Sequence, residues 1–127
     1  MERKIKVLLV EPNKLPKEII ISNTLKDKQK CVNGRIEYFY MEDYKDVVFI
    51  CNEESKLNGM KPNRDMKYDI IFGPFLIVGD DKNIGEDMSL KKEQIEKYMK
   101  IFDKKSIEKT NDKIIAIKMQ KYEELGL

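Results

Sequence analysis

A polar segment in the middle of the chain carries the side chains best suited to bind a ligand. It runs from Cys51 to Arg64, and the apolar run 69–78 follows it. Turn-forming and charged residues between two apolar runs are held on a short, constrained loop beside a core. The donors and acceptors of this segment are Asn52, Glu53, Lys56, Asn63 and Arg64. The pattern favours binding, and it does not name a ligand.

A bend and two aromatic rings lie in the apolar run that follows. Gly73 and Pro74 interrupt the run, and proline cannot donate to a β-ladder, so the strand must be bent, bulged or at an edge there. Phe72 and Phe75 flank this bend, and one of the rings could stack on a planar ligand.

The same residues also have a purely structural interpretation. In it, the asparagines satisfy the backbone of the turns, Arg64 pairs with Asp65 or Asp69, and the two rings belong to the core. The sequence leaves both interpretations open.

The absence of histidine removes several classes of chemistry. The chain has no histidine, so the commonest general base, the usual serine or cysteine triads and most zinc sites are excluded. Cys31 and Cys51 lack metal-ligand spacing, and although a disulfide between them is arithmetically allowed, we expect two reduced thiols in the core.

An acidic stretch and scattered glycines resemble two kinds of binding loop without matching either. Asp80, Asp81, Glu86 and Asp87 could hold a hard cation, but Gly85 falls where a calcium loop needs a ligand. We therefore favour a solvated acidic turn. The glycines form neither a Walker loop nor a dinucleotide loop, so we expect no metal and no cofactor.

The composition indicates one globular domain with a densely charged surface. The 127 residues are 41% hydrophobic and 38% charged, and the net charge is +2. Acidic and basic residues are interleaved, which disfavours nucleic-acid binding. No run is long enough to span a membrane, and no signal region precedes the first strand, so we expect a cytoplasmic protein.

Hydrophobic periodicity predicts the elements that position the polar segment. Predicted strands cover residues 4–11, 18–22, 35–41, 47–51 and 69–78, and residues 52–64 form a loop.

Helical periodicity appears at two places and again in the tail. Helices are predicted at residues 24–32, with Asn23 as N-cap and a left-handed stop at Asn33-Gly34, and at residues 89–102. Residues 111–125 form a last helix, with Ile115, Met119 and Tyr122 on one face, or residues 113–119 form a strand.

The expected fold is α+β, with a curved, mostly antiparallel sheet of about five strands, two packed helices and a C-terminal helical extension. We expect a single core domain at residues 1–102 and an extension at residues 103–127 for an oligomer or partner contact.

Five segments of the chain resemble a known family. They are Lys6-Val-Leu-Leu-Val-Glu-Pro12, Ser22-Asn-Thr-Leu25 with the helix to Gly34-Arg-Ile-Glu37, Cys51–Arg64, Asp69–Gly79 and Ser89–Phe102. The family consists of small proteins of unknown function from phages and conjugative elements of Firmicutes, often encoded near anti-restriction genes. The chain departs from the family pattern at Ser55, where glycine is usual, at Lys61, where proline is common, and after Phe102.

The resemblance implies a setting in which small proteins act by binding. We expect a non-enzymatic binding protein in the cytoplasm of a bacterial host, acting in counter-defence by sequestering a small nucleotide-like immune signal. Arg64 and Lys56 would meet phosphate, Phe75 would stack, and the other polar residues would read sugar or base edges. The expected ligand contacts are Asn52, Glu53, Lys56, Asn63, Arg64, Gly73, Pro74 and Phe75.

Two alternatives remain. One is a protein–protein inhibitor of a host defence protein, in which the tail and the strand residues Tyr38 and Tyr40 make the contact. The other is an enzyme that degrades a nucleotide signal, with Glu53 or Glu54 as general base near Arg64. In all of these, a homo-oligomer would deepen a pocket on so small a domain.

Overall fold

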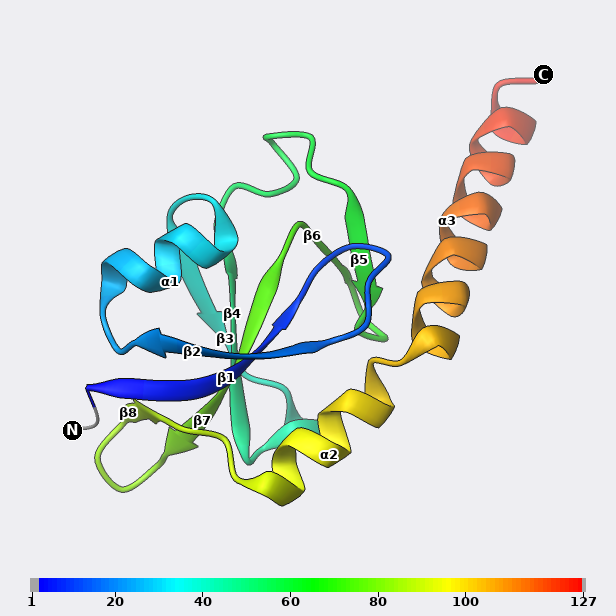
Figure 1. Ribbon diagram of the computed structural model, residues 1–127. Coiled ribbons are helices and arrows are strands. Elements are labelled where there is room, and N and C mark those ends of the chain that lie inside the picture. Colours follow the sequence, from blue (N-terminus) through cyan, green and yellow to red (C-terminus); the bar gives the residue numbers. More distant parts are fainter. Residues whose placement is uncertain (1–2, 127) are drawn as a thin grey trace.

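An antiparallel main sheet is the framework of the computed structural model, which describes residues 3–126 (Figure 1). Its strands lie in the order β2 (Lys17–Ser22), β1 (Lys4–Val10), β7 (Phe75–Asp81), β4 (Val47–Asn52) and β3 (Ile36–Phe39), and β8 (Glu86–Met88) pairs with the end of β7. A second sheet consists of β5 (Pro62–Asp65) and β6 (Ile70–Phe72). All of these pairings are antiparallel.

Helices cover both faces of the main sheet. α1 (Leu25–Val32) lies on one face, the short 3-10 helix η1 (Glu42–Tyr44) and α2 (Lys92–Ile101) lie on the other, and α3 (Lys104–Glu124) follows α2. The predicted α+β fold, with a mostly antiparallel sheet, two packed helices and a C-terminal helical extension, is confirmed.

Two hydrophobic clusters, one on each face, hold the helices to the sheet. Val32 of α1 packs on the face formed by alternate residues of the central strands, including Ile50 and Val78. Tyr98 and Phe102 belong to the cluster on the opposite face. Because the central strands are buried on both sides, their sequences are nearly continuous apolar runs.

The ends of α1 follow local rules. Thr24, rather than the predicted Asn23, is the N-cap, because its side chain accepts a hydrogen bond from the amide of Asp27 at 3.2 Å. Asn23 instead donates to the carbonyl of Asp87 in β8. At the other end Asn33 is left-handed, with φ of 62°, as the Asn-Gly stop predicts.

The segment around the bend differs from the prediction. The predicted loop at residues 52–64 is wrong in its last part, because β5 begins at Pro62. Proline is tolerated there because the first residue of an edge strand need not donate. The single strand predicted at residues 69–78 is divided at Gly73 and Pro74, so that β6 and β7 belong to different sheets.

The C-terminal tail is helical, so the alternative of a strand at residues 113–119 is wrong. The first turns of α3 pack against β5, and Figure 1 shows the rest extending away from the sheets. No helix in the described residues is long and apolar enough to cross a bilayer.

A buried tyrosine predicts how the stability of the fold depends on pH. Tyr98 is fully buried and its hydroxyl donates to Asp46. Burial has the larger effect and the hydrogen bond the smaller, and both raise the pKa of Tyr98. The folded state therefore keeps a proton that the unfolded state loses above about pH 10, so the free energy of unfolding falls as the pH rises past that value.

Tyr98→Phe should cost about 1 kcal/mol at neutral pH and flatten the alkaline fall by up to about 1.4 kcal/mol per pH unit. Urea denaturation from neutral pH to pH 11.5 measures both quantities. Tyr122→Phe, at an exposed position, is the control. Equal alkaline slopes in the two variants would contradict the assignment.

Candidate functional site

Arg64 is fully buried at the junction of β5 with the start of α3. Its Nε donates to Ser106 Oγ at 2.9 Å, and its Nη2 donates to the carbonyls of Lys14 at 2.6 Å and Phe102 at 3.1 Å. Its Nη1 donates to the backbone and side-chain oxygens of Asn63. The predicted pairing with Asp65 or Asp69 is wrong, because those carboxylates bind Lys113 and Lys56.

The charge of Arg64 is held by neutral acceptors. All of the oxygens that accept from it belong to carbonyls, a side-chain amide or a hydroxyl. Burial lowers the pKa of Arg64 to about 10, and the charge of Asp103 opposes that shift. At neutral pH the guanidinium is therefore a positive charge beneath the junction of α2 and α3.

The two predicted asparagines are buried and fully bonded. Asn63 donates to the carbonyls of Val10 and Gly73, both at 2.8 Å, and its side-chain oxygen accepts from Arg64. Asn52 donates to the carbonyl of Val32 at 3.0 Å and accepts from an amide two residues ahead. Both side chains therefore fasten the backbone.

The predicted bend and its ring belong to the framework. Gly73 has φ of +76°, and a Cβ there would lie against the side chain of Met60. Pro74 follows it between the two sheets. Phe75 is fully buried, and its ring packs against Phe49 and Phe102. Because Arg64 and Phe75 are fully buried and line neither of the grooves described below, they are not ligand contacts in the proposal.

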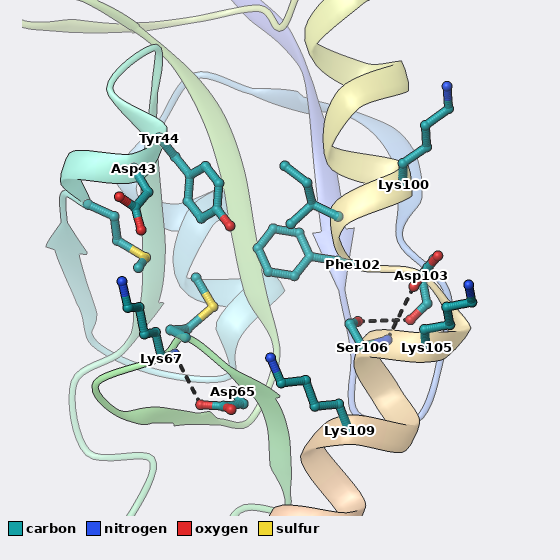
Figure 2. A pocket seen from close by; sticks show the side chains of 13 residues that line it. Asp43, Tyr44, Asp65, Lys67, Lys100, Phe102, Asp103, Lys105, Ser106 and Lys109 are labelled. Atoms are coloured by element: carbon teal, nitrogen blue, oxygen red, sulfur yellow. Dashed lines mark hydrogen bonds between the residues drawn. The ribbon is translucent and has the colours of Figure 1, made fainter.

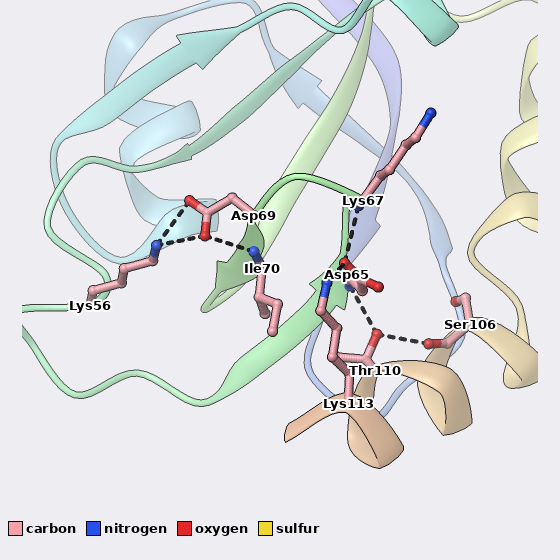
Figure 3. Close-up of polar contacts among 8 residues, drawn as sticks. All are labelled: Lys56, Asp65, Lys67, Asp69, Ile70, Ser106, Thr110 and Lys113. Carbon is pink, nitrogen blue, oxygen red and sulfur yellow. Dashed lines mark hydrogen bonds and ion pairs between the residues drawn. The ribbon is translucent and has the colours of Figure 1, made fainter. Parts of the chain in front are cut away.

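Of the predicted ligand contacts, Glu53 and Lys56 are exposed, and they line a groove with Asn52. We name it the acidic groove; its volume is about 400 Å³. Lys56 forms an ion pair with Asp69 at 2.8 Å (Figure 3) and lies over the ring of Phe72. The only lysine of this groove is thus already paired.

Apart from Ser55, the remaining lining of the acidic groove is apolar or acidic: Glu37, Phe39, Cys51, Glu54, Leu57, Met66, Ile70 and Ile71. Burial raises the pKa of the Cys51 thiol to about 11, so this sulfur is protonated at neutral pH and is a poor nucleophile. Arg64 is not among the lining residues, so the structure does not place it beside Glu53 or Glu54 as the enzymatic alternative requires.

A second groove lies where α2 meets α3, facing η1 and the turn between β5 and β6 (Figure 2). We name it the basic groove; its volume is about 730 Å³. The apolar part of its lining is Met41, Tyr44, Met66, Ile101 and Phe102.

Four lysines line the basic groove: Lys67, Lys100, Lys105 and Lys109. All are exposed, and within residues 3–126 none of them forms an ion pair. Figure 2 shows the side chain of Lys109 reaching toward Phe102 and that of Lys67 extending on the side of Asp43, while Lys100 and Lys105 point away from the space between them. Lys67 Nζ also lies over the ring of Tyr68, 5.2 Å from its centroid. The groove therefore combines ammonium groups that form no ion pair with an aromatic floor.

Two of the three carboxylates of the basic groove are already bonded. Asp103 caps α3 by accepting from the amide of Ser106. Asp65 accepts from Lys113 and from the amide of Lys67, both at 3.0 Å (Figure 3). Asp43 is exposed at the edge. The available charge of the groove is therefore positive.

Short polar contacts fix the helix that carries Lys105 and Lys109. The amide of Asp65 donates to Thr110 Oγ1 at 2.9 Å, and that hydroxyl donates to the carbonyl of Ser106. These contacts join β5 to the first turns of α3, as Figure 3 shows. Together with Arg64, they set the wall of the basic groove.

Sequence reasoning did not find the basic groove, although one signal pointed to it. Lys105 and Lys109 are four residues apart and share a helical face. Their partners across the groove, Lys67 and Tyr44, come from distant turns. Local spacing cannot show that pairing.

The acidic turn at the β7–β8 hairpin is bonded within the fold. Asp87 accepts from Lys28 and from the hydroxyl of Tyr38 at 2.7 Å, and Asp81 accepts from the amide of Asn83. Within residues 3–126 no group of three or more acidic or cysteine side chains is arranged to hold a metal ion.

Comparison with known proteins gives one match. A family model described as a domain of unknown function (DUF3846) matches residues 5–103. No curated protein and no solved structure matches the chain.

Proposed function

The chain belongs to the DUF3846 family, a domain of unknown function, and we propose that it is a non-enzymatic binding protein whose basic groove holds a small anionic ligand with a planar part. The observation that carries the proposal is the pair of exposed lysines, Lys67 and Lys109, beside the aromatic residues Tyr44 and Phe102, with Lys100 and Lys105 at the rim of the groove. Clustered ammonium groups without ion pairs attract phosphate or carboxylate.

Two further features support an anionic ligand. Arg64 lies beneath the groove wall as a buried cation whose acceptors are all neutral, so it adds to the positive potential there. Tyr44 is half-buried, and its ring packs edge-on against Phe102 with 6.4 Å between the ring centroids. This contact fixes the orientation of the tyrosine ring at the groove. A nucleotide-like molecule offers both phosphate and a planar base.

The proposal includes the setting that the resemblance implies. A protein of a phage or mobile element that sequesters a nucleotide-like immune signal would act in counter-defence. The support is the resemblance of the Cys51–Arg64 segment and the chemistry of the basic groove. The proposed ligand site is the basic groove and not the Cys51–Arg64 segment, because the lysines that form no ion pair line the basic groove.

Calorimetry against cyclic dinucleotides, cyclic mononucleotides and ADP-ribose-type compounds tests the proposal, with inorganic phosphate as the anion control. We expect at least one nucleotide to bind more tightly than phosphate, with an affinity that falls as salt is added. Ligand recovered after prolonged incubation should be intact. Absence of binding by every compound to folded protein would contradict the proposal.

Neutralising two lysines of the basic groove should weaken binding selectively. Lys67→Gln/Lys109→Gln removes two charges while keeping long side chains, and it should raise Kd by roughly 10–100-fold. Lys26→Gln/Lys30→Gln is the matched control, because those lysines are exposed on α1, which packs on the opposite face of the sheet. Equal affinities of the two variants would place the ligand elsewhere.

A further inference from the structure

The distal part of α3 presents an apolar face to solvent. Ile115, Met119 and Tyr122 lie on one side of the helix, with 56%, 60% and 58% of their surface exposed. Lys118 flanks this face. Residues 114–122 contain two lysines and no acidic residue, and Glu123 and Glu124 follow them at the end of α3, so the apolar face has a lysine at one edge and a glutamate at the other.

Ile114 is half-buried, but the rest of this stretch is exposed. The last polar tie between α3 and β5 is the ion pair of Lys113 with Asp65 at 3.0 Å. Short helices are marginal in water by themselves, and most helical stability comes from packing of an apolar face. A partner for residues 114–122 would supply that packing.

The acidic groove has the complementary character. Its apolar lining includes Phe39, Ile71 and Phe72, and Leu57 stands beside them with 86% of its surface exposed. An exposed leucine next to partly buried apolar side chains is a feature of binding surfaces.

The charge of the acidic groove is also complementary to the helix. Glu37, Glu53 and Glu54 are exposed and form no ion pair within residues 3–126. Asp69 is neutralised by Lys56. The groove therefore offers free carboxylates around an apolar centre, which suits a basic amphipathic helix.

We propose that residues 114–122 of a second copy of this chain dock in the acidic groove, and that the exchange is reciprocal. Ile115, Met119 and Tyr122 would cover the apolar lining, while Lys118 at the edge of this face would meet the glutamates. Each copy donates one helix and offers one groove, so a two-fold axis makes both contacts at once. The exposure of the helix residues shows that the groove of their own chain does not hold them.

Charge reversal tests the exchange. Lys118→Glu/Lys121→Glu makes the helix acidic, and Glu53→Lys/Glu54→Lys makes the groove basic. Sedimentation velocity over a dilution series should show a dimer for the wild type and a dimer at least about 10-fold weaker for each variant by itself. Mixed together, the two variants should form a heterodimer, because the acidic helix then meets the basic groove and the basic helix meets the acidic groove.

Each other outcome overturns the proposal. These are a wild type that stays monomeric at every concentration, a dimer that both variants retain, and variants that do not associate when mixed. Loss of the dimer in the helix variant alone would show that α3 pairs with α3 instead. All four substituted side chains are exposed, and circular dichroism checks that each variant is folded.

Discussion

Replacing Arg64 by leucine should destabilise the protein by about 3–5 kcal/mol. The substitution removes the donors to Ser106 Oγ and to the side-chain oxygen of Asn63, and it leaves the carbonyls of Lys14 and Phe102 without this partner. Leucine fills part of the volume and satisfies none of these oxygens. Urea denaturation at neutral pH measures the loss.

Arg64→Lys is the matched variant for this experiment. It keeps the positive charge, but a single ammonium cannot reach acceptors on three sides as the planar guanidinium does. We expect Arg64→Lys to lower the free energy of unfolding less than Arg64→Leu does. Ligand affinity should also fall more in Arg64→Leu than in Arg64→Lys. A stable Arg64→Leu protein would mean that the buried hydrogen bonds do not hold α3 in place.

Replacing Phe102 by alanine should also cost about 3–5 kcal/mol. Only 3% of this side chain is exposed, and its ring packs against those of Phe49, Phe75, Tyr44 and Tyr98. The same ring lines the basic groove, so its loss would remove part of the groove floor. Thermal and urea denaturation measure the stability.

Phe102→Leu separates volume from ring geometry. Leucine keeps most of the apolar volume, so we expect a loss of about 1–1.5 kcal/mol and a protein that is folded at room temperature. If the ring forms the floor for a planar ligand, the affinity of this folded variant should still fall severalfold. An unchanged affinity would place the planar part of the ligand away from Phe102.

The main sheet could be predicted because local patterns determine it. The runs 47–50 and 75–78 are continuously apolar, and the strands they form are buried on both faces. Asn33 and Gly34 end α1 by a rule that concerns only a few neighbouring residues. Proline also indicated the bend at residue 74, although the separation into two sheets depends on distant pairing.

The role of Arg64 could not be predicted, because its partners are distant in sequence. A lone arginine among turn-forming residues is usually exposed. Here Lys14, Phe102 and Ser106 bring three oxygens to one point, from positions 50, 38 and 42 residues away. Residue type alone suggested a ligand contact, whereas in the structure the guanidinium joins distant segments of the chain by hydrogen bonds.

The distant partners of Arg64 have a consequence during synthesis. The ribosome completes the sheet strands before Ser106 and Thr110 exist, so a nascent chain that ends near residue 103 lacks the hydroxyl that accepts from Arg64 Nε and the hydroxyl that accepts from the amide of Asp65. The domain can reach its final packing only after the first turns of α3 have left the exit tunnel. A chain truncated before that point would lack both contacts, so we expect its β5 and its Arg64 side chain to be held less firmly than in the longer chain.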